Sequence, residues 1–320
     1  DSCGLRQAGQ RVIFGGMAAP VIDAHVHLYP PDVNRDPAGW AAAHGEPQWA
    51  RMSVRTRKTT GRAVQGFPSL DELLRDMDAA GVERAVLLGW YWQRQENCVS
   101  QNRFHAECVR AHPDRLLAFA TVQADVGAEA LVEVRRAKDD GLIGLGELSP
   151  HSQGVAVDDE RWLGLLTLAG ELGMPVNLHV TEPECAPYPG RVETPLADFW
   201  AMARAFPQVR FILAHWGGRI WRAAGETEKK PPANVWVDTA ATPLLYGVAE
   251  SEVWREGFAA CGPERVLWGT DYPLDLYPGD AGFGTMAGFL RQARAVLPTA
   301  ALDTVLGGTA ARLFGLKMSR

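Results

Sequence analysis

Two histidines separated by a single residue are the first feature of this sequence with an evident chemical use. His25 and His27 lie in the stretch V-I-D-A-H-V-H-L-Y, residues 21–29, whose apolar and small residues are typical of a short buried strand. Side chains two residues apart in a strand project from the same face. Two imidazoles at the end of a strand therefore provide half of a site for a divalent transition metal. Because paired histidines also occur without a metal, the rest of the chain must distinguish the two cases.

Four further side chains with metal-ligand chemistry follow other apolar runs. Glu147 ends the run G-L-I-G-L-G-E, His179 ends P-V-N-L-H, His215 follows F-I-L-A, and Asp271 follows V-L-W-G-T. Each of these residues stands at the C-terminal end of a predicted strand, and none stands at the beginning of one. Groups at the same height of separate strands are expected to meet, which predicts one metal site.

The mixture of imidazoles and carboxylates predicts which ions this site binds. Such ligands suit Zn²⁺, Mn²⁺ or Fe²⁺, of which we expect Zn²⁺, as one ion or two. The ion lowers the pKa of a bound water toward about 7, so that the water is a nucleophile at neutral pH. A carboxylate beside the water can carry its proton to a leaving group, and Asp271 is the predicted carrier.

Eight β-rich runs alternate with longer amphipathic stretches and provide the strands that these side chains need. This alternation implies parallel pairing, because each crossover needs a helix to return the chain. Eight such units in one domain favour a closed (β/α)8 TIM barrel over an open doubly wound sheet, which would string the histidines along an edge. The predicted strands are 20–27, 83–89, 116–122, 142–148, 175–180, 209–214, 234–239 and 265–270.

The amphipathic stretches predict the outer helices. Ser69 and Glu72 form a capping-box pattern ahead of an apolar stripe that reaches Ala80. Pro195 is placed to open another helix, which ends before Pro207. The further predicted helices are 98–111, 126–139, 159–172, 250–260, 284–296 and 299–314, the last packing across the barrel.

Length and composition fit a single globular domain. Of the 320 residues, 47% are hydrophobic and 22% charged, and we expect one domain over 17–320 after an N-terminal extension over 1–16. The net charge of −6 argues against a general nucleic-acid binder, and no run approaches the roughly 18 apolar residues of a membrane span. Five scattered cysteines fit reduced thiols. We therefore expect a cytoplasmic protein that acts on a small molecule, as a monomer or a homo-oligomer.

Several of these motifs together resemble a known family. The strings I-D-A-H-V-H, N-L-H, L-A-H-W-G-G and L-W-G-T-D-Y-P-L are similar to those of the amidohydrolase superfamily, and most similar to its second amidohydrolase family, over roughly residues 18 to 316. The resemblance implies a metal-dependent barrel enzyme. It further implies that His25, His27, His179 and Asp271 hold a metal, and that His215 is a ligand of a second metal or an acid/base facing the substrate. The family includes lactonases, amide and ester hydrolases, and non-oxidative decarboxylases of aromatic or unsaturated acids.

Two positions bear on the reaction and on the number of metal ions. Asp23 stands where several decarboxylases of this family carry a metal-binding Glu, and its shorter side chain favours a place behind the ligands and a hydrolytic reaction. Glu147 resembles the bridging Glu of two-metal members, although many close relatives keep one metal. Alternatively, Glu147 only hydrogen-bonds His179 or a water, so both metal counts stay open.

The connection over residues 28–68 is a candidate for contact with the substrate. Connections of this length in compact domains are usually functional lids or disordered segments, and we expect a lid here. Its cationic side chains can clamp a substrate carboxylate, although at least two of them are expected to be merely solvated. They are Arg51, Arg55, Arg57 and Lys58.

Further candidates follow the second, fourth and fifth predicted strands. At least one residue of the run Trp90-Tyr91-Trp92 is expected to form a wall of the pocket. His151 is more often structural than functional in such a loop, and Cys185 is expected to be incidental. The polar candidates in the loop after His179 are Glu182, Tyr188 and Arg191.

Three functions are compatible with these residues. The leading one is hydrolysis of a small, carboxylated lactone, ester or amide, with Asp271 moving the proton and His215 completing the metal site or stabilising the oxyanion. The alternative is non-oxidative decarboxylation of an aromatic or unsaturated acid. A barrel that binds a metal without catalysis is the third, which the water-accessible ligand set disfavours.

Overall fold

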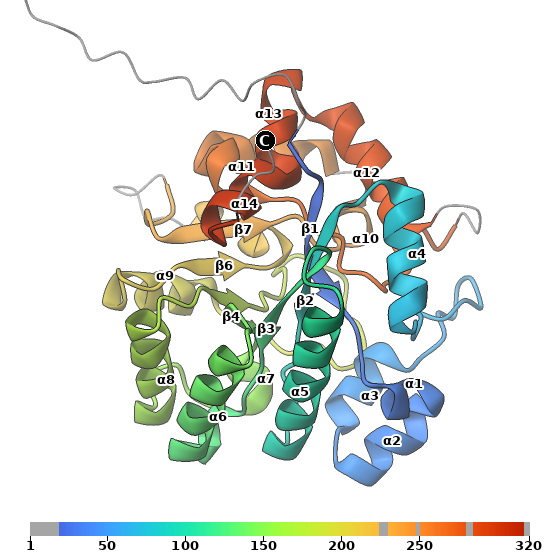
Figure 1. Ribbon diagram of the computed structural model, residues 1–320. Helices are drawn as coiled ribbons and strands as arrows, with labels where there is room; N and C mark the ends of the chain where they lie inside the picture. The colour runs from blue at the N-terminus through green and yellow to red at the C-terminus, as the bar shows by residue number, and fades with distance from the viewer. Residues whose placement is uncertain (1–18, 224–229, 248–249, 280–283, 317–320) are drawn as a thin grey trace, which may run out of the picture.

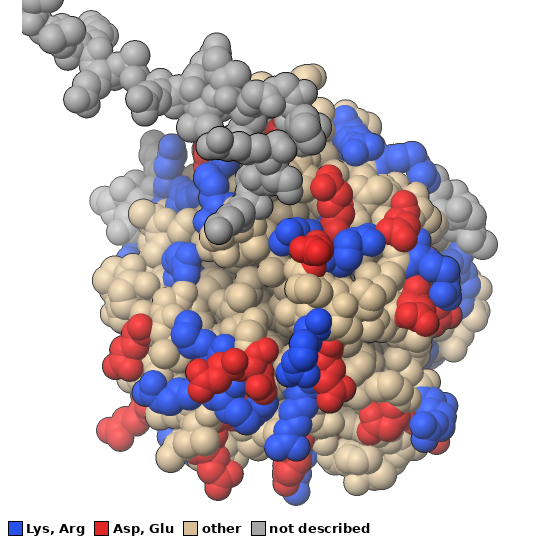
Figure 2. Space-filling view, in the orientation of Figure 1, with Lys and Arg blue, Asp and Glu red and all other residues tan. Residues whose placement is uncertain are grey.

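The structure is a computed structural model that describes residues 19–223, 230–247, 250–279 and 284–316 (Figure 1). The N-terminal extension predicted over residues 1–16 lies outside the described residues. No described helix combines the length and the apolar character that crossing a membrane requires. On the face in Figure 2, Lys and Arg side chains are interspersed with Asp and Glu over the outer helices.

Eight parallel strands pair in the order of the sequence, so the predicted (β/α)8 barrel is confirmed. Hydrogen bonds from Ala24 N to Trp268 O and from Asp271 N to His25 O, both 2.9 Å long, join the last strand region to the first. The strands are β1 (Ile22–His27), β2 (Arg84–Leu88), β3 (Leu116–Ala120), β4 (Gly144–Leu148), β5 (Val176–Leu178), β6 (Phe211–Leu213), β7 (Val235–Asp238) and β8 (Val266–Leu267).

Strand β8 is shorter than the predicted run 265–270. After Leu267 the chain leaves the ladder with β7, and the Trp268 amide donates to the carbonyl of Val305. The carbonyls of Trp268 and Tyr272 accept from β1 instead. The residues before Asp271 therefore close the barrel without regular strand geometry.

The long outer helices were predicted within a few residues of their observed bounds, and they surround the strands in Figure 1. Ser69 caps the first of them, since its hydroxyl accepts from Glu72 N while the Glu72 side chain accepts from Ser69 N. These helices are α4 (Leu70–Ala80), α5 (Gln95–Ala111), α6 (Ala128–Asp139), α8 (Glu160–Glu171), α9 (Leu196–Ala205), α11 (Glu250–Cys261) and α12 (Thr285–Val296).

The helix predicted over 299–314 is interrupted, which corrects that prediction. Helices α13 (Thr299–Asp303) and α14 (Thr309–Leu313) flank a π-helical turn over Thr304–Gly308. A Cβ at Gly307 would collide with the Pro20 carbonyl, so this turn allows the chain to approach β1 closely. The expected packing across the barrel is confirmed, because Ala310 and Leu313 lie in one apolar cluster with inward-facing strand residues.

The segment over 28–68, which was predicted to be a long lid-like connection, is partly helical. It contains α1 (Pro31–Arg35), α2 (Pro37–His44) and α3 (Pro47–Ser53), each with proline at its first position. Figure 1 shows these helices at the end of the barrel opposite α13. Their apolar side chains pack with aromatic residues of neighbouring segments in what we call the aromatic cluster, and a lid function for the segment stays a prediction. The cluster contains Tyr29, Trp40, Trp49, Phe67, Trp90, Tyr91 and Trp92.

Candidate metal centre

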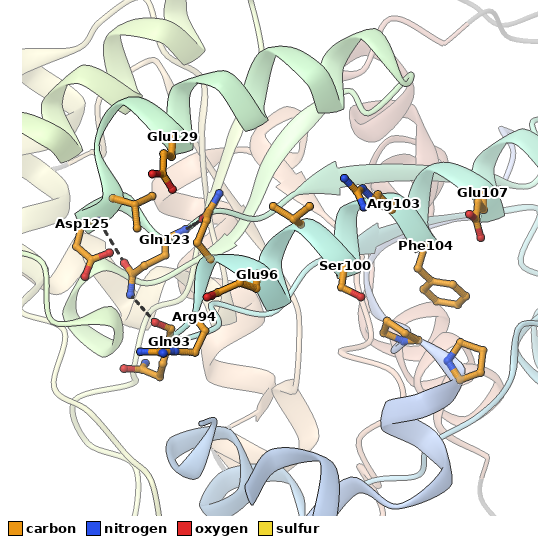
Figure 3. Close-up of a pocket in the computed structure, with 15 residues that line it drawn as sticks. Gln93, Arg94, Glu96, Ser100, Arg103, Phe104, Glu107, Gln123, Asp125 and Glu129 are labelled. Atoms are coloured by element: carbon orange, nitrogen blue, oxygen red, sulfur yellow. Dashed lines mark hydrogen bonds between the residues drawn. The ribbon is translucent and has the colours of Figure 1, made fainter. Parts of the chain in front are cut away.

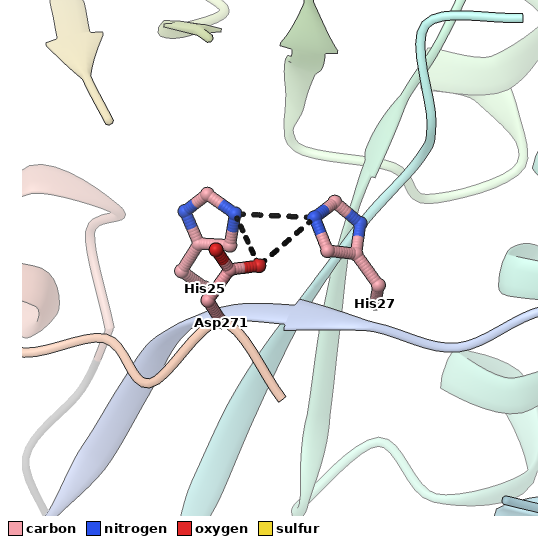
Figure 4. Close-up of side chains that lie close together, drawn as sticks. All are labelled: His25, His27 and Asp271. Carbon is pink, nitrogen blue, oxygen red and sulfur yellow. Dashed lines mark hydrogen bonds and ion pairs between the residues drawn. The ribbon is translucent and has the colours of Figure 1, made fainter. Parts of the chain in front are cut away.

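Three of the six predicted ligands meet at the C-terminal ends of β1 and β8 (Figure 4). The Nε2 atoms of His25 and His27 are 3.2 Å apart. Asp271 Oδ1 lies 3.6 Å from the first of these nitrogens and 3.5 Å from the second. All three side chains are buried, and we call them the first group.

The other three predicted ligands meet beside the first group. Glu147 Oε1 lies 3.0 Å from His179 Nδ1 and 3.7 Å from His215 Nε2, and we call these three buried residues the second group. Glu147 Oε2 is also 3.6 Å from His27 Nε2, and Asp271 Oδ2 is 3.8 Å from His215 Nδ1. The two groups therefore form one polar cup, in which Glu147 and Asp271 each lie within 4 Å of a histidine of the other group.

The hydrogen bonds of the first group show that its three ligand atoms suit a cation. His25 Nδ1 lies 2.9 Å from Asp238 Oδ2, and His27 Nδ1 lies 3.2 Å from the Leu88 carbonyl. If each Nδ1 carries the ring proton, two Nε2 lone pairs and a carboxylate oxygen converge with no hydrogen-bond donor between them. No Lys or Arg side chain forms an ion pair with Glu147 or Asp271 within the described ranges. Buried acceptors of this kind are stable with a divalent metal between them.

Asp238, at the end of β7, supports the cup and was not identified from the sequence. Its carboxylate accepts from Asn177 Nδ2 and from the His215 amide, in addition to contacting His25. Burial opposes charge on His25, but Asp238 and Asp271 outweigh burial and raise the pKa of His25 to about 10. A carboxylate behind a ligating histidine fixes the ring and strengthens it as a ligand. The only sequence signal was an aspartate at a strand end, in V-W-V-D.

Asp23 lies behind the ligands, as predicted. Its carboxylate accepts from the amide and the hydroxyl of Thr270 and from the amide of His25. Burial, opposed by these hydrogen bonds, raises the pKa of Asp23 to about 7. The residue therefore ties the end of β1 to the segment that carries Asp271.

His215 presents one defined nitrogen to the cup. Its Nδ1 lies 3.1 Å from the Ala240 carbonyl, to which only a protonated nitrogen can donate. In the neutral ring, Nε2 then carries the lone pair and lies on the Glu147 side. His215 can therefore bind a metal or accept a proton through Nε2.

A cavity of about 280 Å³ opens above the cup and contains several predicted substrate contacts. Trp90 and Tyr91, at the edge of the aromatic cluster that faces the cup, line it, whereas Trp92 does not line it and packs against Trp40 and Trp49. The prediction of an aromatic wall is thus confirmed for two of the three residues.

The four cationic candidates divide into two pairs. Arg55 and Arg57 line the cavity, while Arg51 and Lys58 are exposed and do not line it. Arg57 pairs with Asp275 at 3.2 Å and also donates to three carbonyls. Arg55 donates through Nε to the Met52 carbonyl at 3.1 Å. Of the two arginines that line the cavity, Arg55 thus has fewer hydrogen-bond and ion-pair partners than Arg57.

The loop after β5 contributes to the cavity in part. Tyr188 and Cys185 line it, and Arg191 pairs instead with Glu193 outside it. Glu182 also lines the cavity, but its carboxylate is held by Arg219. His151 lies away from the cavity, 2.8 Å from Asp198, which agrees with a structural role.

A second hollow, of about 850 Å³, lies on the outside of the barrel between α5 and α6 (Figure 3). Charged residues of both signs line it, among them Arg94, Glu96, Arg103 and Asp125. Neither metal-ligand group contributes to its lining. The cup is therefore the candidate site.

Comparisons with known proteins agree with this geometry. The model of the family described as Amidohydrolase matches residues 22–316. A search of curated proteins found no match. Among solved structures, 5-carboxyvanillate decarboxylase from Sphingomonas paucimobilis is 19% identical, with a TM-score of 0.67 over 94% of this chain and 100% of that chain. The same-named enzyme from Novosphingobium aromaticivorans, complexed with manganese, is 15% identical, with a TM-score of 0.68 over 93% and 96%.

A Pseudomonas putida protein assigned as a 2-pyrone-4,6-dicarboxylic acid hydrolase is 20% identical, with a TM-score of 0.63 over 95% of this chain and 100% of that chain. At these identities the similar structures show the barrel fold. The two groups of ligands in this chain support a divalent metal at the cup.

Proposed function

Because this chain belongs to the amidohydrolase family, we propose that it is a metal-dependent hydrolase of a small, carboxylated lactone, ester or amide. The observation that carries the proposal is the convergence of four imidazoles and two carboxylates in one buried cup below a cavity. Such a set binds and activates water where a substrate carbonyl can reach it.

The two groups suggest how ions are held. We propose that His25, His27 and Asp271 hold one ion, and that the second group holds another more weakly. His179 lies 3.0 Å from Glu147, so we assign it to the second group; that it shares an ion with His25, His27 and Asp271, as the family resemblance implies, stays a prediction. When bound, a divalent ion here polarises a substrate carbonyl and lowers the pKa of nearby water. We propose Zn²⁺ as the resident ion, and Mn²⁺ is the competing assignment.

Asp271 and His215 are the groups that can move protons. Asp271 faces both groups of ligands, so it can take a proton from the attacking water and give it to the leaving group. The lone pair of His215 Nε2 faces the same space and can accept a proton or bind the second ion. Water adds to the carbonyl carbon as the bond to the leaving group breaks.

The cavity suggests a single-ring substrate with a carboxylate. Its volume of about 280 Å³ suits one substituted ring, and Trp90 and Tyr91 form an aromatic wall for it. Arg55 lines the same cavity and has a guanidinium suited to a carboxylate. Burial lowers the pKa of Arg55, while Tyr188, which lines the same cavity, acts in the opposite direction.

Non-oxidative decarboxylation is the second candidate, and the same aromatic wall and arginine favour it. In that reaction the bond between the ring carbon and the carboxylate breaks, carbon dioxide leaves, and Asp271 gives a proton to the ring carbon. Two of the similar structures carry names of this activity.

The four described cysteines are free, which fits the proposed cytoplasmic location, and homo-oligomer formation stays a prediction.

One experiment tests both candidates. The protein is loaded separately with Zn²⁺ and Mn²⁺ and incubated in ¹⁸O-labelled water with single-ring lactones, esters, amides and hydroxylated aromatic acids. We expect metal-dependent product with one labelled oxygen, whereas release of carbon dioxide together with an organic product that carries no label would favour decarboxylation. Turnover that survives complete metal removal, or no turnover on the whole panel, would contradict the proposal.

A further inference from the structure

Five consecutive residues after β6 have a left-handed backbone. The φ angles are 59° at His215, 59° at Trp216, 58° at Gly217, 57° at Gly218 and 60° at Arg219. Glycine adopts this conformation readily, but residues with a Cβ do so at a cost. Three of the five carry a Cβ, so the surrounding structure must hold the turn in place.

The turn determines where the His215 imidazole lies. His215 is its first residue, and the amide of His215 donates to Asp238 at 3.0 Å. Relaxation of this backbone toward a right-handed conformation would redirect the side chain away from Glu147. Contacts that stabilise the turn therefore also position the nitrogen that faces the cup.

Helix α10 (Thr242–Tyr246) contacts the start of the turn through side-chain hydrogen bonds. The Tyr246 hydroxyl lies 2.9 Å from the His215 carbonyl and 2.9 Å from Glu182 Oε2, so its single proton is shared between two acceptors. Thr242 Oγ1 accepts from Trp216 Nε1 at 2.9 Å. The first two residues of the turn are thus held from one side.

Arg219 holds the end of the turn. Its guanidinium forms two hydrogen bonds with Glu182, pairs with Glu184, and lies 5.5 Å from the centre of the Tyr246 ring. Arg219, Glu182 and Tyr246 are all buried, so their contacts are little screened by water. Glu182 therefore joins the two ends of the turn through one carboxylate.

We propose that Tyr246 and Glu182 are positioning residues that hold His215 over the metal cup through this left-handed turn. The inference rests on the proposed function only for its effect on turnover. Neither residue acts on the substrate in this assignment. Glu182 lines the cavity but presents a carboxylate already paired with Arg219, and Tyr246 reaches the site through the backbone of His215.

Hydrogen–deuterium exchange tests the positioning without any substrate. In Tyr246→Phe, loaded with Mn²⁺, we expect faster exchange in the peptide over 213–222, while exchange in β1 and the unfolding temperature stay close to wild type. Tyr277→Phe is the matched control, because it loses a 2.6 Å hydrogen bond to Gln292 and does not line the cavity. Unchanged exchange over 213–222 in Tyr246→Phe would overturn the proposal, whatever the reaction is.

Kinetics on a substrate from the labelled-water panel give the second readout. We expect kcat of Tyr246→Phe to fall roughly tenfold or more, since small misplacements of a reacting group are costly, with KM within about twofold. A loss confined to KM, or a kcat equal to that of wild type, would count against the proposal. If Tyr246→Phe does not fold, Glu182→Gln, which keeps the side-chain shape, is expected to give the same exchange and kcat pattern.

Discussion

The two groups of the cup differ in what holds their ligands. In the first group, Nδ1 of His25 contacts Asp238 and Nδ1 of His27 contacts the Leu88 carbonyl. Neither partner is a proposed ligand. In the second group, His179 contacts Glu147, itself a proposed ligand, at 3.0 Å. A bound ion would have to compete with that contact. Ligand atoms also lie close together in the first group, where the two Nε2 atoms are 3.2 Å apart. The groups therefore differ in the partners of their other nitrogens, which lie outside the ligand set for both histidines of the first group but not for His179 in the second.

This difference has a structural basis on each side of the barrel mouth. The first group lies beside the aromatic cluster, where His27 contacts Trp90 at a ring distance of 5.5 Å and Tyr29 at 6.4 Å. The second group is bounded by the loop after β5 and the left-handed turn after β6, which polar contacts such as Arg219 with Glu182 hold. The aromatic cluster also reaches the second group, because the Tyr91 ring lies 5.2 Å from the His179 ring, and ion pairs add to this packing on the second side.

The variants with the largest expected effect test which of the two groups binds metal more tightly. We expect His25→Ala combined with His27→Ala to reduce bound metal to less than roughly one tenth of wild type, because two of the first group's three ligands are removed. Glu147→Ala should keep at least one ion per chain, and should lower stoichiometry only if wild type holds two. Elemental analysis after gel filtration measures both. A Glu147→Ala protein as empty as the double variant would contradict the comparison.

The next effect separates metal binding from proton transfer within the first group. Asp271→Asn keeps an oxygen ligand but loses the group that carries the proton, so turnover should fall by about two orders of magnitude or more. Metal content should stay close to wild type, because His25 and His27 remain. Parallel elemental analysis and steady-state kinetics check this. Full activity in Asp271→Asn would show that another residue moves the proton.

The ligands themselves were predictable from sequence because the barrel makes a simple demand. Parallel strands bring their C-terminal ends to one face, so Glu147, His179 and Asp271, each at the end of an apolar run, had to meet. The residues behind them were not predictable in this way. Asp238 has the same local signal as a ligand, and only the packing of β7 against Asn177 and His25 shows that it lies behind the cup.

Local conformation was missed where tertiary contacts override the intrinsic preference of the residues. Trp216 and Arg219 rarely adopt a left-handed backbone, and the contacts that hold them come from α10 and from Glu182, distant in sequence. The short helices α1 to α3 carry proline at their first positions, but their stability comes from the aromatic cluster and not from their length.

A third prediction concerns the pH dependence of the free energy of unfolding that the buried His105 produces. His105, on α5, is buried below Leu28, with Nε2 at 3.0 Å from the Leu28 carbonyl, and burial lowers the pKa of His105 to about 4, with a smaller contribution from His27. Between the ordinary value near 6.5 and about 4, the unfolded chain binds a proton that the folded chain does not. The free energy of unfolding should therefore fall by about 3 kcal/mol as pH drops through this range.

Urea titrations of wild type and His105→Gln from pH 7 to pH 4 measure this contribution. The stability difference between the two proteins should shift in favour of the variant by that amount at the acid end. A constant difference across the range would show that His105 gains its proton in the folded state as readily as in the unfolded one.

The smallest effect tests whether Asp238 is what organises the first group. Asp238→Asn keeps the shape of the side chain but replaces the charged partner of His25 with a neutral amide, so metal affinity should weaken roughly 10- to 100-fold. Asp198→Asn is the matched control, because it alters another aspartate–histidine pair, with His151, outside the cavity. Titration with Mn²⁺ against a competing chelator measures both dissociation constants. Equal affinity in Asp238→Asn and Asp198→Asn would mean that the strands alone, without the carboxylate behind them, organise His25 and His27.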